Sequence, residues 1–463
     1  SSAPSDKKFT ELHARISSEH LGHVAYRVGI LAALRSRVLN GQAIGVMITA
    51  SHNPEDDNGI KIVDPMGEML EGAWETYATD MVNTPDASLE QFLQRVIATH
   101  QVNLKAKSLV FLGWDTRPSS LSLSIATSDG VESMGGKLNS IGLTSTPIIH
   151  FLVMCWNTNE EYGRANDAGY YSKLSSAFNH VHNVVNLFMP SSLLSYLISV
   201  DCANGVGALV LKKMIDFLQE LQSNSSTNKE NGSSLHVIPN ARYASVDGDA
   251  DRIIYYYVDD SGIFHLLDGD RIAILVAGYL KELIKKTGIN IQVGLVQTAY
   301  ANGSSTKYPL LEKVLNIPVA WTLTGVKHLH HKAKEFDIVL FNSRTVEHLT
   351  KLLFKCYQQS VTMYVYAALA YCFLIYLHSF SKDCSVVKTE GADVKCIAPA
   401  GLQQKITLSS NFHDYFRPSG TENFVRIYAE ADSQKNADSL AAEVAQAVHS
   451  LAGSVGNVCE HPL

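Results

Sequence analysis

The feature that most constrains the fold of this 463-residue chain is a recurring unit in which a short apolar run ends in a polar loop. Such runs lie at 44–49, 108–113 and 197–203. Their length predicts buried strands, whereas residues 19–38 carry apolar side chains near helical spacing and predict an amphipathic helix. Because strands that alternate with helices are typical of α/β layers, we expect an α/β fold with mainly parallel sheets.

Composition and charge exclude several classes of protein. The chain is 46% hydrophobic and carries 38 Lys and Arg against 45 Asp and Glu. Binding of a nucleic-acid backbone needs a basic face, so we expect no nucleic-acid partner. An anionic substrate would require local basic pockets in this acidic background.

The cysteine content and the first residues bear on location. The seven cysteines are odd in number and form no C-x-x-C pair, which argues against a disulfide framework and for a reducing compartment. The first residues contain no apolar segment of the kind found in a secretory signal. We therefore expect a cytoplasmic protein. The sequence assigns no oligomeric state.

Residues 361–377 form an apolar run without a charged residue. A membrane span needs about 20 apolar residues, so this run lies at the short limit. A buried core helix is the favoured interpretation and a membrane partner is not expected. A short span and a locally abnormal stretch of sequence remain as alternatives.

A candidate metal site begins at Asp247, where Asp249 and Asp251 follow at alternate positions in a glycine-containing loop. Carboxylates spaced in this way can converge on one hard cation, Mg²⁺ or Ca²⁺. An EF-hand needs Gly at loop position 6 and Glu at position 12, but Arg252 and Val258 stand there. Three carboxylates leave room for water or a phosphate oxygen, as Mg²⁺ prefers in phosphoryl transfer. A solvated acidic turn is the plainer alternative.

A candidate nucleophile, Ser51, follows the apolar run at 44–49 and precedes His52, Asn53 and Pro54. Adjacent Ser and His residues seldom act as nucleophile and base, and no G-x-S-x-G elbow surrounds this serine. A phosphorylated Ser51 would carry a charge of about −1.5 to −2. It would place an oxygen on the metal and present a phosphoryl group for in-line attack, although a plain turn serine is the alternative.

A candidate phosphate-binding loop lies near the carboxyl end of the chain. It contains Arg417, Ser419, Gly420 and Thr421, and Arg426 follows. Two arginines, two hydroxyl groups and the free N–H groups of a glycine-permitted loop can surround a phosphate. A simple Pro-Ser-Gly turn is the alternative.

A histidine-rich segment includes Lys327, His328, His330 and His331. No Cys or carboxylate completes a zinc site at suitable spacing. Lys327 and His328 could serve as general acid or base beside a phosphosugar, whereas purely structural roles are as plausible for the other two histidines.

Two nucleotide-binding motifs are absent from the sequence. Gly205 and Gly207 follow an apolar run, but Val210 stands where a dinucleotide fingerprint needs its third glycine. The sequence also contains no P-loop of the form G-x-x-x-x-G-K-[ST], so a kinase with that phosphate loop is excluded.

The Ser51 loop, the aspartate loop, the histidine-rich segment and the phosphate-binding loop are four elements that also occur, in this order, in the α-D-phosphohexomutase superfamily. In this respect the chain resembles that superfamily. The resemblance covers about residues 44–430 and is carried by the following stretches: GVMITASHNPEDDNGIKIVDPMGEML, VDCANGVGAL, DGDADRIIYYYVD, LDGDRIA, QTAYANGSSTKY, TGVKHLHHKAKEFDI and FRPSGTENFVRIYAEADS. Details of these stretches look most like the branch of the family that acts on N-acetylglucosamine phosphates.

The resemblance implies three similar α/β domains and a smaller C-terminal α+β domain around a central cleft. The expected boundaries are 1–190 for the domain with the phosphoserine loop, 191–290 for the metal loop, 291–380 for an incomplete sugar-binding loop and 381–463 for the phosphate-binding domain.

The resemblance also implies a chemistry, the interconversion of N-acetylglucosamine 6-phosphate and 1-phosphate for UDP-N-acetylglucosamine synthesis. A phosphorylated Ser51 would give its group to the substrate, and the resulting bisphosphate would return the other group. The family pattern assigns Mg²⁺ to Ser51, Asp247, Asp249 and Asp251; catalytic roles to Ser51, His52, Lys61, Arg252, Lys327 and His328; and phosphate binding to Arg417, Ser419, Gly420, Thr421 and Arg426.

Three family stretches are missing from this chain. Residues 9–18 replace an early Y-G-T-A-G-F-R stretch, and the polar segment 222–234, which predicts disorder, replaces a G-A-D-F-V stretch. No E-x-N-G-H sugar loop follows Ile338. Three alternatives therefore stay open: a mutase-like phosphosugar-binding protein with impaired catalysis, a mutase of glucose or mannose phosphates, and a membrane-anchored form.

Overall fold

The computed structural model divides into two compact units. The first comprises 1–188 and 197–265, and the second comprises 189–196 and 266–463. The structure describes residues 16–18, 21–51, 53–186, 198–221 and 242–267, together with shorter or interrupted stretches within 269–285, 292–298, 317–322, 326–342, 353–354, 390–396, 404–406, 413–418, 425–431 and 435–446.

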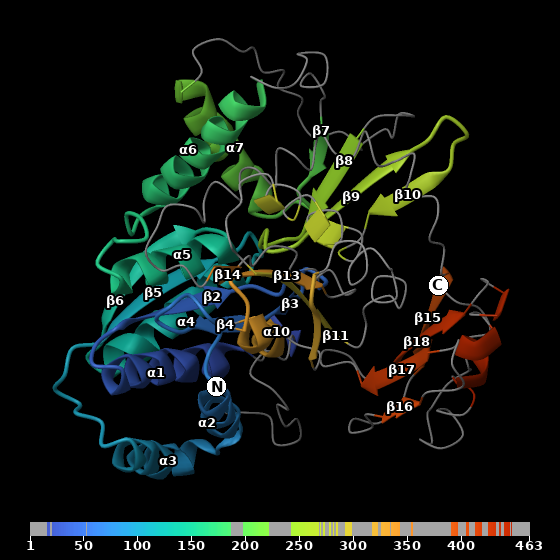
Figure 1. Cartoon of the computed structure of the whole chain (residues 1–463). Coiled ribbons are helices and arrows are strands. Elements are labelled where there is room, and N and C mark those ends of the chain that lie inside the picture. Colours follow the sequence, from blue (N-terminus) through green and yellow to red (C-terminus); the bar gives the residue numbers. More distant parts are fainter. Residues whose placement is uncertain are drawn as a thin grey trace. The chain divides into compact units, whose positions relative to one another are not determined.

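A four-stranded sheet in the first unit has the order β4-β2-β5-β6 (Figure 1). Strand β2 (Ala43–Ile48) runs parallel to β5 (Leu109–Trp114), which runs parallel to β6 (Lys137–Leu143), and β4 (Ile60–Val63) is antiparallel to β2. All of β2 is buried, which confirms the strand predicted at 44–49 to within one residue. The parallel pairs agree with the expected α/β class.

Helices cover both faces of this sheet, so β2 alternates between two cores. Ile44, Val46 and Ile48 face a cluster formed with α1 (Gly22–Val38), α2 (Gly72–Asn83), α3 (Asp86–Thr99) and α4 (Ser120–Ser133). Ala43 and Met47 face a second cluster formed with α5 (Thr146–Asn157). This period-two alternation is what a strand buried on both faces requires.

The helix predicted at 19–38 is present, but the prediction that it is amphipathic was wrong, because it has no polar face turned to solvent. Helix α1 begins at Gly22 and is buried almost all the way round, including three arginines. Arg27 donates hydrogen bonds to backbone carbonyls at the C-terminal end of α2, Arg35 pairs with Asp64, and Arg37 donates to the carbonyls of residues 106 and 134. Distant acceptors bind these guanidinium groups, so the three arginines are buried rather than solvated.

A second sheet has the order β10-β9-β8-β7. Strand β7 (Ile198–Asp201) is parallel to β8 (Arg242–Val246), β8 is antiparallel to β9 (Ile253–Val258), and β10 (Phe264–Leu267) lies at the edge. Helix α7 (Gly207–Leu221) follows β7 and contacts α6 (Asp167–Asn186). The glycine-containing loop that begins at Asp247 therefore joins β8 to β9.

The second unit contains two further sheets. In the first, β11 (Val293–Thr298) is parallel to β12 (Val319–Thr322) and β13 (Ile338–Asn342), β14 (Leu353–Phe354) is antiparallel, and α10 (Val326–Ala333) lies against the sheet. In the other, β15 (Glu390–Cys396), β18 (Val425–Ala431), β17 (His413–Pro418) and β16 (Gln404–Ile406) pair antiparallel throughout. The four domain boundaries stay a prediction.

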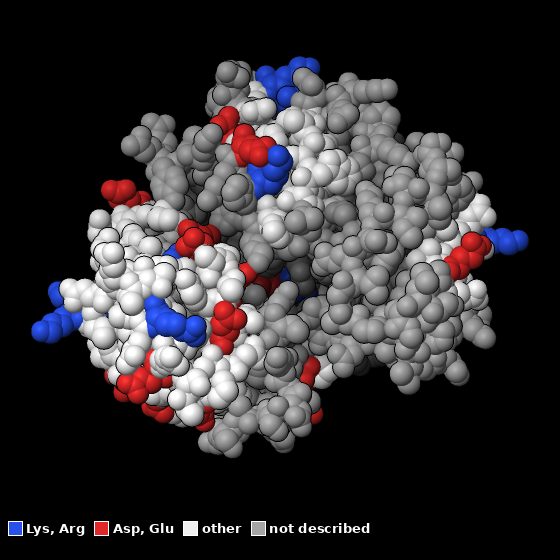
Figure 2. All heavy atoms as spheres, turned by 90° about the horizontal axis from the view of Figure 1, so that it is seen from below, with Lys and Arg blue, Asp and Glu red and all other residues white. Residues whose placement is uncertain are grey.

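Surface charge and membrane segments complete the description. Figure 2 shows acidic and basic side chains scattered over the described part of one face. Within the part of the chain that the structure describes, every helix is too short or too polar to cross a bilayer. The apolar run 361–377 lies outside the described residues, and the expected lack of a nucleic-acid partner stays a prediction.

Candidate active site

Ser51 lies just beyond the carboxyl end of β2 in a left-handed backbone conformation, with φ of 51°. Only 3% of its surface is exposed. Its backbone N–H donates to Oγ1 of Thr49 (3.0 Å), whose hydroxyl donates to Oδ2 of Asp115 (2.8 Å). A non-glycine residue in this conformation is strained, and such strain persists only where the surroundings enforce it.

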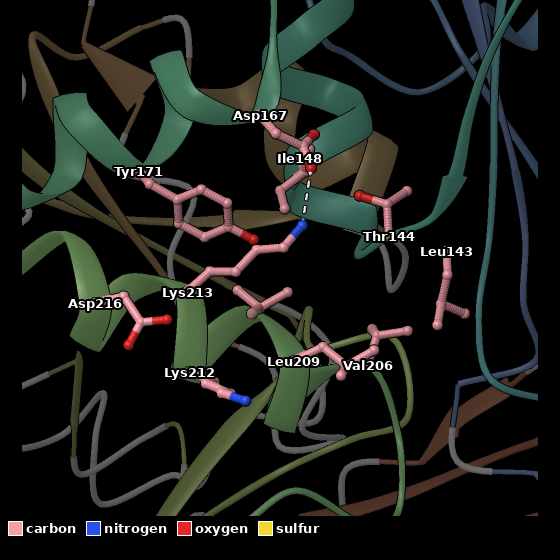
Figure 3. Close-up of a pocket in the computed structure, with 11 residues that line it drawn as sticks. Leu143, Thr144, Ile148, Asp167, Tyr171, Val206, Leu209, Lys212, Lys213 and Asp216 are labelled. Carbon is pink, nitrogen blue, oxygen red and sulfur yellow. Dashed lines mark hydrogen bonds and ion pairs between the residues drawn. The ribbon is translucent and has the colours of Figure 1, made fainter. Parts of the chain in front are cut away.

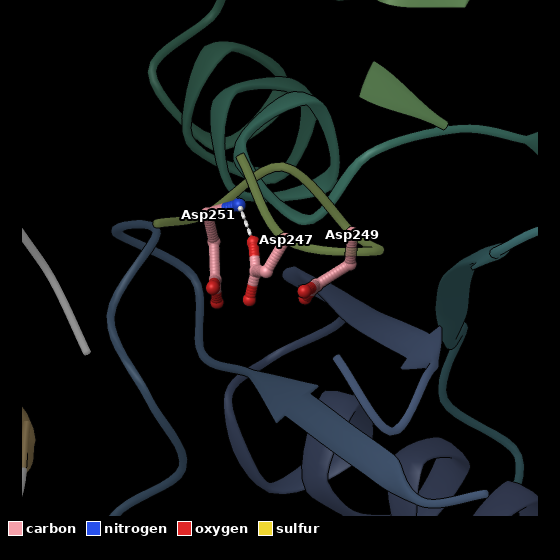
Figure 4. Close-up of side chains that lie close together, drawn as sticks. All are labelled: Asp247, Asp249 and Asp251. Atoms are coloured by element: carbon pink, nitrogen blue, oxygen red, sulfur yellow. Dashed lines mark hydrogen bonds between the residues drawn. The ribbon is translucent and has the colours of Figure 1, made fainter. Parts of the chain in front are cut away.

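The loop between β8 and β9 gathers three carboxylates. Oδ1 of Asp247 accepts hydrogen bonds from the backbone N–H groups of Asp251 and Arg252, at 3.1 Å each. These bonds close the loop, and the side chains of Asp247, Asp249 and Asp251 then extend in the same direction (Figure 4). One oxygen from each carboxylate lies within 4.8 Å of the other two.

Glycines allow this loop to approach the Ser51 loop. A Cβ atom on Gly248 would lie 2.5 Å from the carbonyl oxygen of Ser51, and one on Gly205 would lie 2.3 Å from the carbonyl oxygen of Gly248. The N–H of Val206 donates to that same Gly248 oxygen at 3.0 Å. Backbone therefore meets backbone across three loops, which only glycine permits.

Lys61 on β4 connects the carboxylates to Ser51. Its Nζ atom lies 2.6 Å from Oδ2 of Asp249, 2.7 Å from Oδ2 of Asp251 and 3.4 Å from Oγ of Ser51. Burial alone would lower the pKa of Lys61, but the negative charges of Asp249 and Asp251 outweigh it and raise that pKa above its usual value. The amine is therefore a cation in this cluster.

The carboxylate loop has the character of a cation site. Burial, followed by the charges of Asp249 and Asp251, raises the pKa of Asp247 to about 8. Oδ2 of Asp247 and Oδ1 of Asp249 are buried and accept no hydrogen bond from the described residues. Buried carboxylate oxygens without donors suit a hard divalent ion, so the residues present fit the predicted Mg²⁺.

Arg252 lies beside the same loop. Its Nε atom is 3.5 Å from Oδ2 of Asp247 and 3.7 Å from Oδ1 of Asp251, and its side chain is 8% exposed. The structure therefore brings together five of the residues that the sequence singled out: Ser51, Lys61, Asp247, Asp249 and Asp251, with Arg252 at their edge.

Two residues of this centre were missed in the sequence. The hydroxyl of Thr146, at the start of α5, donates to Oδ2 of Asp249 at 2.5 Å, and Arg117 binds the Ser51 loop. A usable signal existed for Arg117, because the strands predicted at 44–49 and 108–113 are observed as parallel neighbours, β2 and β5. The loops after their carboxyl ends must meet at one edge of the sheet.

The remaining candidates lie either outside the described residues or in the second unit. His52, Ser419, Gly420 and Thr421 lie outside those residues. Lys327 and His328 belong to α10 in the second unit. Arg417 and Arg426 stand directly opposite each other in the ladder between β17 and β18. Their assigned roles stay predictions.

A pocket of about 350 Å³ lies beside the centre, between α5, α6 and α7 (Figure 3). An ion pair of 3.3 Å between Lys213 and Asp167 crosses it. Thr144 and Val206 form part of its wall. Thr144 lies two residues before Thr146, and the N–H of Val206 donates to the carbonyl oxygen of Gly248. None of the predicted site residues lines this pocket.

Three family models match the chain. One describes domain III of phosphoacetylglucosamine mutase and matches residues 268–360. The others describe phosphoglucomutase/phosphomannomutase, with its α/β/α domain I at residues 30–88 and its C-terminal domain at 406–447. The first of these two matches contains Ser51 and Lys61. Fold, site and matches together define a protein of the phosphohexomutase class.

The phosphoacetylglucosamine mutase of Homo sapiens is 39% identical to this chain, and the comparison covers 96% of the chain and 94% of the human protein. The chain belongs to the phosphoacetylglucosamine mutase family. The aligned region runs over 516 positions, more than the 463 residues here, so the human protein has segments without a counterpart in this chain.

Solved structures agree with this assignment. An Aspergillus fumigatus N-acetylphosphoglucosamine mutase, a serine-to-alanine variant in complex with glucose 1,6-bisphosphate, is similar with a TM-score of 0.81 and 31% identity, over 98% of this chain and 97% of that one. A complex of the Aspergillus fumigatus enzyme with GlcNAc-6P and magnesium has a TM-score of 0.77 and 32% identity, over 95% and 94% of the two chains.

Proposed function

We propose that this protein interconverts N-acetylglucosamine 6-phosphate and N-acetylglucosamine 1-phosphate, with Ser51 as the carrier of the phosphoryl group. The observation that carries the proposal is the single buried cluster of Ser51, Lys61 and three carboxylates. The activity is the one that the names of the relatives state, and a solved relative contains both GlcNAc-6P and magnesium.

In the first step a hydroxyl oxygen of the substrate attacks the phosphorus atom carried by Ser51. A new O–P bond forms as the bond from phosphorus to Oγ of Ser51 breaks; the substrate hydroxyl loses its proton and Oγ takes one, so the net proton transfer is from the substrate to Ser51. The product is a hexose bisphosphate, and a relative was solved with such a bisphosphate. The bisphosphate then exchanges its ends, and attack by Oγ on the other phosphate restores the carrier and releases product.

Lys61 is the group best placed to handle the proton at Oγ of Ser51. Its ammonium lies 3.4 Å from that oxygen, and the flanking carboxylates keep it charged. It donates a proton or hydrogen bond to Oγ as the P–O bond breaks, and it receives the proton in the reverse direction. Neutralising the charge of the leaving oxygen is a main part of phosphoryl-transfer catalysis.

Mg²⁺ would be held by Asp247, Asp249, Asp251 and an oxygen on Ser51, where it would neutralise charge on the phosphoryl group. Thr146 orients one of these carboxylates through its hydrogen bond to Asp249. A ligand whose hydrogen-bond partner is fixed keeps its orientation when the cation binds.

The other candidates have proposed roles around this centre. Arg252 and His52 contribute positive charge or proton transfer next to Ser51, and Lys327 and His328 act as acid or base toward the sugar. The phosphate that does not react is gripped by Arg417, Ser419, Gly420, Thr421 and Arg426. The reaction supplies precursor for UDP-N-acetylglucosamine, and the seven cysteines favour a cytoplasmic location.

A second candidate function is a mutase-like protein that binds phosphosugar without turning it over. It is favoured by one observation, the lack of an E-x-N-G-H stretch after Ile338 in a chain shorter than its alignment with the human relative. A mutase of glucose or mannose phosphates is a third candidate, since the same loss affects recognition of the sugar hydroxyl groups.

A coupled assay with N-acetylglucosamine 6-phosphate, Mg²⁺ and glucose 1,6-bisphosphate as primer tests the proposal. We expect turnover by the wild type and none by Ser51→Ala, with slower turnover of glucose and mannose phosphates. Intact mass before and after phosphatase reports phosphorylation of Ser51. Phosphorylation and sugar binding without turnover would establish the second candidate instead, and no phosphorylation at all would refute the carrier role.

A further inference from the structure

The guanidinium group of Arg117 lies under the loop that presents Ser51. Its NH1 atom donates to the carbonyl oxygens of Pro54 (2.6 Å) and Asp57 (3.1 Å). Its NH2 atom donates to the carbonyl oxygens of Ser51 (3.1 Å) and Asn53 (2.8 Å). Four carbonyl groups from one loop therefore converge on one side chain.

Asp115 fixes the direction of this arginine. Its Oδ1 atom accepts the backbone N–H of Arg117 at 3.0 Å, and its Oδ2 atom lies 3.3 Å from Nε of Arg117. The same Oδ2 accepts the hydroxyl of Thr49, which in turn accepts the N–H of Ser51. One carboxylate thus holds both sides of the Ser51 turn, from Thr49 and from Arg117.

Ser51, Asn53 and Pro54 lie outside the strands and helices of the described residues, so a side-chain donor can bind their carbonyl groups. Between β2 and β4 the chain makes a strained turn at Ser51 and pairs only briefly through β3 (Asp57–Asn58). Carbonyl groups shielded from water require donors. A planar guanidinium with fixed N–H directions can serve several at once, whereas an ammonium is a point donor.

We infer that Arg117 is a positioning residue that keeps the Ser51 loop in its left-handed turn, with Oγ directed at Lys61. Its two terminal nitrogens are occupied by backbone carbonyls, so its action passes through the loop rather than through direct contact with the phosphate. This inference rests on the proposed role of Ser51 as the phosphoryl carrier, because only then does the placement of Oγ set the rate.

Arg117→Lys tests the inference with the full chain. Lysine keeps the positive charge but cannot reach four carbonyl groups, so we expect faster amide hydrogen exchange in peptides covering residues 49–59 and unchanged exchange in α5. A misplacement of the reacting oxygen by about 1 Å costs about 100-fold in rate. We expect kcat to fall by that order, with KM for N-acetylglucosamine 6-phosphate and Mg²⁺ affinity little changed.

Arg95→Lys is the matched control, because Arg95 is exposed on α3 and its guanidinium group lies over the ring of Phe92, away from the Ser51 loop. It should leave exchange and kinetics at the wild-type level. Unchanged exchange at 49–59 in Arg117→Lys would overturn the inference. A rise in KM with normal kcat would overturn it too, since it would make Arg117 a substrate contact.

The proposed function is checked separately by wild-type phosphorylation with glucose 1,6-bisphosphate. If the wild type accepts no phosphate, the carrier role fails, while hydrogen exchange in Arg117→Lys still decides whether the arginine orders the loop. Arg117→Ala extends the series, and its thermal unfolding shows whether any loss is confined to the loop.

Discussion

The Nζ atom of Lys61 lies 2.6 Å from Oδ2 of Asp249 although the two residues are 188 positions apart in the chain. The lysine comes from the sheet that carries Ser51, and the aspartate comes from the turn between β8 and β9. Asp249 is fully buried, so its charge requires a partner. This ion pair therefore links the sheet that leads into Ser51 to the carboxylate loop electrostatically.

Replacing Lys61 by methionine separates these two roles. We expect kcat to fall by about 10²- to 10⁴-fold, the usual contribution of a positioned acid or base. Mg²⁺ binding, measured by calorimetry, should be at least as tight as in the wild type, because a competing positive charge has left the carboxylates. Lys105→Met is the control, since Lys105 is exposed, and it should change neither quantity. Weaker Mg²⁺ binding in Lys61→Met would contradict this account.

Asp247→Asn tests the character of the carboxylate loop. At pH 9, above the pKa of about 8 of Asp247, the variant lacks one negative charge of the buried cluster but keeps an Oδ1 acceptor for the N–H groups of residues 251 and 252. Without divalent ions we expect the variant to be more stable than the wild type by about 0.5–2 kcal/mol, because the repulsion among the three carboxylates is reduced. With saturating Mg²⁺ the order should reverse, because only the wild type gains fully from binding.

Urea unfolding in EDTA and in Mg²⁺ measures both effects. Mg²⁺ affinity should fall by more than about 10-fold, the smallest loss found when only a supporting partner of a ligand is removed. The exposed Asp129→Asn serves as the control, and it should gain the same stability from Mg²⁺ as the wild type does. Equal Mg²⁺ affinity in wild type and Asp247→Asn would exclude this loop as the cation site.

Sequence patterns predicted the parts of this site that depend on local order. The apolar run before Ser51 and the alternating aspartates placed both loops correctly, because burial and turn chemistry leave marks within a few residues. The arrangement of Arg27 and Arg117 leaves no such mark. Each donates to backbone carbonyls far along the chain. Because every residue has a backbone carbonyl group, residue types do not indicate which carbonyl accepts the hydrogen bond. Only the tertiary fold reveals which carbonyls lack a partner.

Cys155 provides a test of the second core of the first unit. Burial raises the pKa of its thiol to about 12, and the thiolate is the reactive form. At pH 8 in the native state we expect negligible alkylation of Cys155 by iodoacetamide, measured by peptide mass. In urea the thiol returns to a pKa of about 8.5 and should react readily. Rapid native alkylation would mean that α5 opens away from the sheet.

Gly248→Ala tests whether the site depends on the approach of two backbones. The added Cβ would lie 2.5 Å from the carbonyl oxygen of Ser51, an atom that cannot move without displacing the rest of Ser51. Overpacking of this kind costs about 1–3 kcal/mol, and we expect both Mg²⁺ affinity and phosphorylation of Ser51 to fall. Gly72→Ala is the matched control, because nothing lies within 4 Å of a Cβ at that helix position. Calorimetry with Mg²⁺ and intact mass after incubation with glucose 1,6-bisphosphate measure the two losses. If Gly248→Ala retained wild-type phosphorylation and metal binding while Gly72→Ala did the same, the two loops would act independently, and the joint site of Ser51 and the aspartates would have to be abandoned.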